Sequence, residues 1–210
     1  VGFAGYDVIR YSEHLPNVPE DDRGLPDMCF ALYDGMVVFD HIRKVVLAVA
    51  LADTRDCDPN DARAIAEKRL EQICSRLAIG NDSVRLTDID LTIEPDLEIE
   101  SNFTQQHFES CVETCREYIK AGDIFQVVFS QRLQRASEAN PLDVYRSLRM
   151  VNPSPFMFLL ETPELHLVGS SPEIMVRVED GETTIRPLAG TRRRGRTEQE
   201  DKELADELLA

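Results

Sequence analysis

A short cationic stretch near the end of the chain has the residue types of an anion-binding site. Residues 187–196 read PLAGTRRRGR, so a Gly190-Thr191 step precedes a run of arginines, between a predicted strand and a predicted helix. Glycine lets a ligand approach the main chain closely, and both guanidinium groups and a helix N-terminus attract anions. The pattern alone leaves two interpretations, an anion site or a solvated basic loop that balances the acidic helix behind it.

Polar side chains also gather on one face of a strand that the sequence predicts over residues 122–134, GDIFQVVFSQRLQ. Alternation places Phe125, Val127 and Phe129 on an apolar core face. The opposite face carries Gln126 and other polar groups, so we expect that face either to meet water or to line a cleft.

The strands that would frame these residues are short. An Asp34-Gly35 turn predicts a hairpin between Cys29–Tyr33 and Met36–Asp40, and the apolar run Lys44–Ala52 predicts a buried strand. Further strands are expected at residues 156–161, 165–169, 173–178 and 183–186, and an Asp180-Gly181 turn joins the last two. Several hairpins combined with long helices predict an α+β layered fold.

Four amphipathic helices are expected, at residues 61–78, 104–122, 140–151 and from Thr197 onward. Thr104 and Gly122 are the predicted caps of the second helix, and Asn140-Pro141 begins the third. The TEQE sequence at 197–200 is a capping box. The first helix is expected to bury an apolar stripe that consists of Ile65, Leu70, Ile73, Cys74 and Leu77.

The composition is that of a globular protein, and it argues against two classes of function. The 210 residues include 23 Lys and Arg against 39 Asp and Glu, a formal net charge of −16, whereas a nucleic-acid binder needs a basic surface. The longest apolar run, Val45–Ala52, is far shorter than the roughly 20 residues of a membrane-spanning helix. The five cysteines fit no zinc pattern, and free thiols indicate a reducing, cytoplasmic location.

The residues at both ends of the chain are typical of the interior of a longer polypeptide. The chain begins at Val1, inside an apolar stretch, and reaches Ala210 inside an amphipathic helix that has no C-cap signal. We therefore expect one partial domain over residues 1–210, with its N-terminal and C-terminal parts missing.

Five blocks, in one order along the chain, resemble the large subunits (component I) of anthranilate synthases, within the chorismate-utilising enzyme family. They are GYDVIRYSEHLP at 5–16, GDIFQVVFSQR at 122–132, NPSPFMF at 152–158, GSSPE at 169–173 and RPLAGTRRRG at 186–195. The resemblance implies an α+β fold of the anthranilate-synthase type, a two-sheet α/β sandwich that is incomplete in this chain. It also implies conversion of chorismate and ammonia to anthranilate and pyruvate in tryptophan biosynthesis. The ammonia would come from glutamine through an amidotransferase subunit or fused domain.

The family pattern implies a substrate site at Gly190, Thr191 and Gln126. Glycine would permit close approach of chorismate, and the Thr191 hydroxyl would bond a substrate oxygen. In family members that add water, the position that corresponds to Gln126 resembles a lysine, and such a lysine can act as a general base on the water. A neutral amide cannot take that role, but it suits a site whose nucleophile is already ammonia. Many aminodeoxychorismate synthases have a PIKGT-type sequence at this segment, with a lysine at the position of Ala189. The absence of both lysines from this chain favours anthranilate as the product.

A second implied site is the family segment at which tryptophan binds and inhibits. It corresponds to Asn152, Pro153, Ser154, Pro155, Phe156 and Met157. The last three side chains would form an apolar wall against the indole, and the two prolines would fix its shape.

The resemblance also implies a magnesium cofactor whose ligands, like the general acid–base histidine, lie downstream of this chain. The 210 residues alone are therefore expected to be inactive. Two alternatives stay open, namely an aminodeoxychorismate synthase component I and a non-catalytic fragment that serves regulation or amidotransferase docking.

Overall fold

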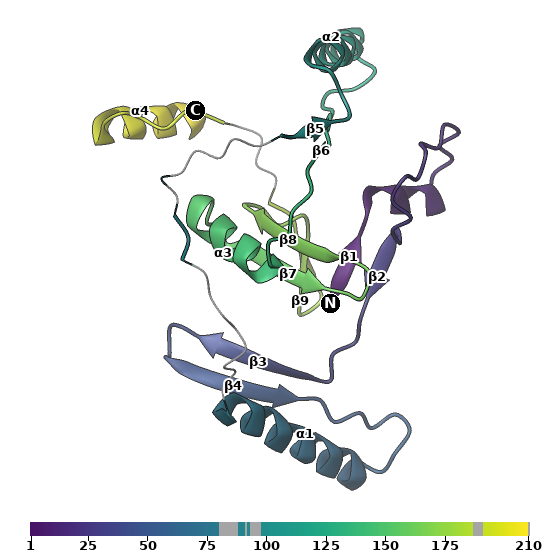
Figure 1. Ribbon diagram of the computed structural model, residues 1–210, viewed down its shortest axis with the longest axis vertical. Helices are drawn as coiled ribbons and strands as arrows, with labels where there is room; N and C mark the ends of the chain where they lie inside the picture. The colour runs from purple at the N-terminus through teal and green to yellow at the C-terminus, as the bar shows by residue number, and fades with distance from the viewer. Residues whose placement is uncertain (80–87, 91, 93–97, 187–190, 210) are drawn as a thin grey trace. The chain divides into compact units, whose positions relative to one another are not determined.

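The computed structural model describes residues 1–79, 88–90, 92, 98–186 and 191–209. The chain divides into two compact units, one formed by Val1–Thr87 with Leu160–His166 and the other by Asp88–Leu159 with Leu167–Ala210. Both units combine helices with small two-stranded sheets (Figure 1), which agrees with the predicted α+β class. The prediction of one partial domain stays a prediction.

The first unit begins with a short sheet and a single 3-10 helix. β1 (Gly2–Ala4) pairs antiparallel with β2 (Met28–Phe30), and η1 (Tyr6–Tyr11) follows β1. The Tyr11 hydroxyl donates a hydrogen bond of 3.0 Å to Asp27 Oδ2. This bond ties η1 to the residue before β2, and together with the charge of Asp27 it raises the pKa of Tyr11.

The second sheet of this unit is a hairpin of β3 (Gly35–Asp40) and β4 (Val45–Ala50). The strand predicted at residues 44–52 is present as β4, but its predicted burial is wrong, because none of its residues is buried and Val45–Leu47 are 43–51% exposed. The predicted hairpin between Cys29–Tyr33 and the following strand is also wrong. The turn lies at residues 41–44 instead. Asp40 Oδ1 accepts two hydrogen bonds from main-chain N–H groups inside that turn, and Lys44 adopts a left-handed φ of 57°.

Helix α1 (Pro59–Ile79) packs on this hairpin (Figure 1). Ala62 and Ala66 are only 2% and 8% exposed, and among the described residues they are the two that are buried. A Cβ atom on Gly35 of β3 would lie 3.0 Å from Cδ1 of Ile73 in α1. The predicted stripe is partly wrong, because Leu70 and Ile73 are half-buried but Ile65, Cys74 and Leu77 are exposed. The buried positions of the helix are the two alanines.

Helix α2 (Gln105–Ala121) of the second unit begins and ends where its sequence predicts. Thr104 Oγ1 accepts a hydrogen bond of 3.3 Å from the main-chain N–H of His107, and Gly122 is the C-cap with a φ of 83°. Aromatic rings pack beside the helix with centroids 4.9–6.0 Å apart, and they belong to Phe103, Phe108 and Phe129.

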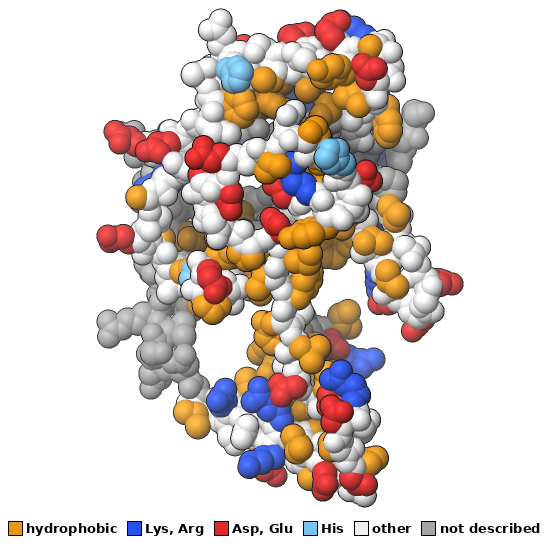
Figure 2. Space-filling model, turned by 90° about the vertical axis from the view of Figure 1, so that its right-hand side faces the viewer, with side chains coloured by type: hydrophobic (Ala, Val, Ile, Leu, Met, Phe, Trp, Pro, Cys, Tyr) orange, Lys and Arg blue, Asp and Glu red, His pale blue; other side chains and the backbone are white. Residues whose placement is uncertain are grey.

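The strand predicted over residues 122–134 is present only at its end. β6 (Leu133–Gln134) pairs with β5 (Glu100–Ser101), whereas residues 124–132 form no ladder with another described strand. Alternation is satisfied, but a strand also requires a neighbouring strand for its main-chain hydrogen bonds. Phe125 and Val128 are accordingly 92% and 86% exposed, and Figure 2 shows many apolar side chains at the visible surface.

The rest of the chain follows the predicted order of elements. α3 (Pro141–Val151) begins at Asn140, whose Oδ1 accepts a hydrogen bond of 2.8 Å from the main-chain N–H of Leu142. The turn at Asp180 and Gly181 has positive φ values of 49° and 81°, as the Asp-Gly pair predicts. The remaining elements are β7 (Phe156–Glu161), β8 (His166–Ser171), β9 (Arg177–Glu179), β10 (Glu182–Thr184) and α4 (Glu198–Leu209).

Candidate functional site

Thr191 lies at the start of a segment that α4 holds in place. Its side chain is exposed, and its carbonyl oxygen accepts a hydrogen bond of 3.0 Å from Arg192 Nη1. Gly190, the other half of the predicted Gly-Thr step, lies outside the described residues, as does Ala189. The contact of Gly190 and Thr191 with substrate stays a prediction.

The three consecutive arginines that follow Thr191 are each paired with a different carboxylate of α4. The pairs, with their N···O distances, are Arg192–Glu207 at 3.0 Å, Arg193–Glu200 at 2.7 Å and Arg194–Asp201 at 2.8 Å. Their charges are thus balanced within the second unit. Of the two interpretations of this stretch, the geometry supports the basic loop that balances the acidic helix.

The same acidic side chains also bind the main chain ahead of α4. Glu200 Oε2 accepts a hydrogen bond of 2.8 Å from the N–H of Arg196, and Asp201 Oδ1 accepts one of 2.7 Å from the N–H of Gly195. Thr197 Oγ1 in turn accepts a hydrogen bond of 3.2 Å from the N–H of Glu200. The predicted helix start at this TEQE sequence is confirmed, and the N-terminus of α4 carries favourable negative charge.

Gln126, the predicted amide of the substrate site, is exposed within residues 124–132. It belongs to the same unit as Thr191. A neutral amide can donate and accept hydrogen bonds but cannot take a proton from water, so its chemistry differs from that of a lysine at this position. Proximity of Gln126 and Thr191 in one cavity stays a prediction.

The predicted inhibitor segment is fixed where it leaves α3. Asn152 is the C-cap of that helix, and its N–H donates a hydrogen bond of 2.8 Å to the Leu148 carbonyl. The Asn152 carbonyl accepts a hydrogen bond of 2.6 Å from Ser170 Oγ of β8. The end of the helix and the neighbouring strand therefore hold the start of this segment in one place.

The side chains of this segment differ in their exposure. Pro153, Pro155 and Phe156 are exposed, and Met157 is half-buried. Ser154 Oγ is shielded from solvent, and no described residue gives it a hydrogen-bond partner. The segment thus combines two prolines with accessible apolar surface, while its role in tryptophan binding stays a prediction.

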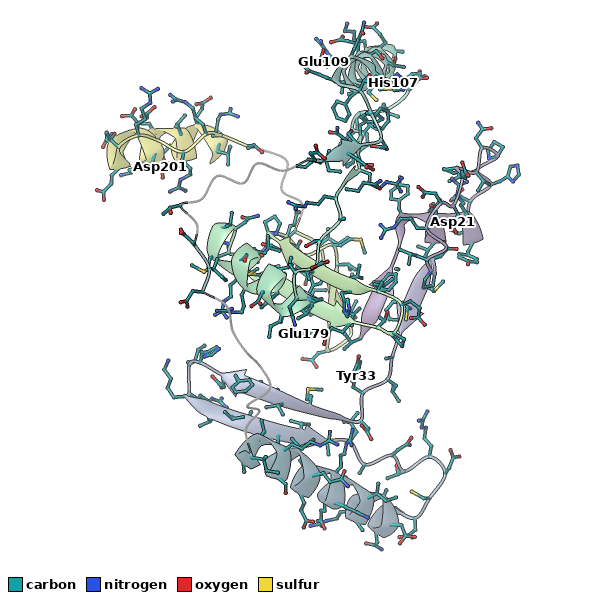
Figure 3. All side chains as sticks on the ribbon, viewed as in Figure 1. Asp21, Tyr33, His107, Glu109, Glu179 and Asp201 are labelled. Carbon is teal, nitrogen blue, oxygen red and sulfur yellow. The ribbon has the colours of Figure 1, made fainter. Side chains whose placement is uncertain are left out.

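A cavity of about 520 Å³ in the first unit has no counterpart in the predictions from sequence. Its lining is rich in charged side chains, namely Asp7, Glu20, Asp21, Asp22 and Asp27 together with Arg10 and Arg23. Arg10 already contacts Asp7 at 2.5 Å, and Asp21, labelled in Figure 3, accepts hydrogen bonds from two main-chain N–H groups. Its walls combine η1 with residues 18–27, an irregular segment whose sequence has no periodicity that could predict a cavity.

The whole chain, residues 1–210, matches the sequence profile described as chorismate binding enzyme. This chain belongs to the chorismate binding enzyme family. The family predicted from the five sequence blocks is therefore confirmed.

Among the chorismate binding enzymes, this chain is similar to anthranilate synthase component 1 proteins. It is 41% identical to anthranilate synthase component 1 of Acetivibrio thermocellus and 40% identical to that of Pseudomonas aeruginosa. All of this chain is matched in both cases, but only 43% and 42% of those relatives, so the chain spans less than half their length.

A solved structure supports the predicted fold. The crystal structure of anthranilate synthase component I from Streptococcus pneumoniae TIGR4 is similar with a TM-score of 0.81 at 35% identity. The similarity covers 100% of this chain and 44% of that chain. An incomplete α+β fold of the anthranilate-synthase type, as predicted, is confirmed.

The described part of this family member contains no group of three or more His, Cys, Asp or Glu that could hold a metal ion. The residues that the structure describes therefore do not provide a magnesium site. All five cysteines are free thiols, and Cys111 and Cys115 are half-buried on α2.

Among the described helices, none has the length and apolar character needed to cross a membrane.

Proposed function

We propose that this chain is the part of an anthranilate synthase component I that supplies Thr191 and Gln126 to the chorismate site. The complete protein would convert chorismate and ammonia to anthranilate and pyruvate in tryptophan biosynthesis. The observation that carries the proposal is identity of about 40% to two component 1 proteins over the full length of this chain.

The proposed chemistry of these residues follows from their side chains. The Thr191 hydroxyl would donate to or accept from a substrate oxygen, and the adjacent glycine would leave room for the ring. Gln126 would orient ammonia by hydrogen bonding, which needs no general base because the nucleophile carries its own lone pair.

The proposal extends to partners and cofactor on the strength of the family alone. Ammonia would come from glutamine through an amidotransferase subunit or fused domain, in a cytoplasmic enzyme. Magnesium would be held by residues outside the described part of this chain. Tryptophan would inhibit through the segment from Asn152 to Met157, whose start is fixed by the Ser170 hydroxyl.

The decisive experiment is an assay of the complete protein that carries this sequence, with chorismate, Mg²⁺ and ammonium chloride. We expect anthranilate fluorescence to appear and chorismate to be consumed in equal amount. Accumulation of aminodeoxychorismate in chromatography would instead support the aminodeoxychorismate synthase alternative, which the alanine at position 189 disfavours. No consumption of chorismate at all would support the regulatory or docking fragment. The 210 residues by themselves are expected to produce no anthranilate.

A further inference from the structure

The segment Thr191–Arg196 makes an unusually dense set of contacts with α4 for an exposed loop. Two carboxylates, those of Glu200 and Asp201, each bind one guanidinium group and one main-chain N–H. Asp201 is labelled on α4 in Figure 3. These bonds fix residues 193–196, and they leave the position of Thr191 itself to a separate pair of residues.

That separate pair is Arg192 and Glu207. Arg192 Nε and Nη2 lie 3.1 Å and 3.0 Å from Glu207 Oε1, while Arg192 Nη1 donates a 3.0 Å hydrogen bond to the Thr191 carbonyl. One planar guanidinium group therefore connects the last turn of α4 to the main chain of Thr191. The point charge of a lysine cannot reproduce this fork.

Glu207 is placed where it does not favour the helix. It lies in the last turn of α4, which contains no basic residue, and a negative charge there opposes the helix dipole. The pair is also exposed, at 44% and 58% of the two side chains, so water and salt weaken its contribution to stability. A role in holding Thr191 explains this acidic side chain better than a role in stabilising α4.

We infer that Arg192 and Glu207 are positioning residues, which set the main chain at Thr191 so that its hydroxyl meets the substrate. This inference rests on the proposed function. Arg192 acts through the Thr191 carbonyl and Glu207 acts through Arg192, so neither side chain touches chorismate. The loss of either one allows the Thr191 hydroxyl to move out of reach of the substrate oxygen.

The test uses Glu207→Ala and Arg192→Lys in the complete protein that carries this sequence. We expect kcat/KM for chorismate to fall roughly tenfold to a hundredfold, while the thermal unfolding midpoint stays close to that of the parent. Lys202→Ala, an exposed change on the same helix, is the control and should leave both quantities unchanged. A value of kcat/KM within twofold of the parent in Glu207→Ala would overturn the inference.

A charge swap, Arg192→Glu with Glu207→Arg, separates positioning from a merely structural ion pair. The swapped pair can still form, but the side chain at 192 then has no hydrogen to donate to the Thr191 carbonyl. We therefore expect kcat/KM to stay low in the swap. Recovery of kcat/KM to the parent value would show that only the ion pair matters.

The methyl resonance of Thr191 in methyl-labelled protein gives a readout that does not depend on activity. It should shift in Arg192→Lys and Glu207→Ala but not in Lys202→Ala. If the parent makes no anthranilate, the proposed function fails, yet this resonance still decides the inference. An unchanged Thr191 methyl shift in both variants would contradict it.

Discussion

Gly195 approaches Asp201 so closely that a Cβ atom on the glycine would lie 2.2 Å from the main-chain nitrogen of Asp201. The N–H of Gly195 also donates a 2.7 Å hydrogen bond to Asp201 Oδ1. Main-chain atoms cannot move aside as the end of a side chain can, so only glycine fits at this position of the TRRRG sequence.

We predict that Gly195→Ala detaches the segment 191–196 from α4. Overpacking of this kind costs about 1–3 kcal/mol, which raises the open population at least about fivefold. Trypsin should therefore cleave at Arg192–Arg194 correspondingly faster, because proteolysis follows the population of the opened state. Lys202→Ala is the control, and equal cleavage rates in Gly195→Ala and the parent would refute the close approach.

Gly169 of β8 lies beneath the ring of Phe158 of β7, and a Cβ atom on Gly169 would lie 2.2 Å from Phe158 Cζ. We predict that Gly169→Ala displaces this half-exposed ring and lowers the free energy of unfolding by about 1–3 kcal/mol in urea titrations. A double-mutant cycle provides the control. In the background of Phe158→Ala the cost should largely disappear, and an equal cost in both backgrounds would show that the ring is not the obstacle.

The carboxylate of Asp53 lies beside Arg55, with Oδ2 and Nη2 2.5 Å apart. Hydrogen bonds from the side chain and the main-chain N–H of Arg55 lower the pKa of Asp53 from 3.8 to about 2. A lowered carboxyl pKa stabilises the folded state above pH 4, and this contribution is lost as the pH falls towards 2. We predict that Arg55→Gln raises the pKa of Asp53 towards 3.8, as measured by carboxyl NMR titration. An unchanged pKa would mean that the ion pair is absent in solution.

Gln126→Lys tests the proposed role of the neutral amide. A lysine in the chorismate site can act as a general base towards water, so we predict at least a tenfold loss of anthranilate formation in the complete protein. Products of water addition should be sought by chromatography in the same samples. Gln105→Lys, the same change at an exposed position of α2, is the matched control. Unaltered kinetics in Gln126→Lys would place this side chain outside the site.

Pro155→Ala and Met157→Ala test the proposed tryptophan site. Loss of the rigid apolar wall should weaken inhibition roughly tenfold or more, because the segment would need to be ordered when the indole binds. Uninhibited turnover should stay close to that of the parent, since these residues are not proposed to touch chorismate. Inhibition constants equal to the parent value in both variants would remove the regulatory assignment.

The sequence by itself determined the features that depend on a few consecutive residues. The caps at Thr104 and Gly122, the start of α3 at Asn140 and the turn at Asp180-Gly181 all lie where their residue types predict. Each of these features satisfies its own main-chain hydrogen bonds or φ angles locally, so no distant partner is needed. The order of the five blocks was likewise sufficient to predict the family.

Only the tertiary structure decided which segments meet. The partner of β3 is β4 rather than residues 29–33, whereas β2 pairs with β1. Alternation predicted a strand around Gln126 but could not supply a neighbour for its hydrogen bonds. From sequence, the arginines after Thr191 were compatible with an anion site, whereas in the structure three of them pair with carboxylates of α4. Pairing and charge balance depend on residues distant in sequence, and local residue types do not specify which of them will come together.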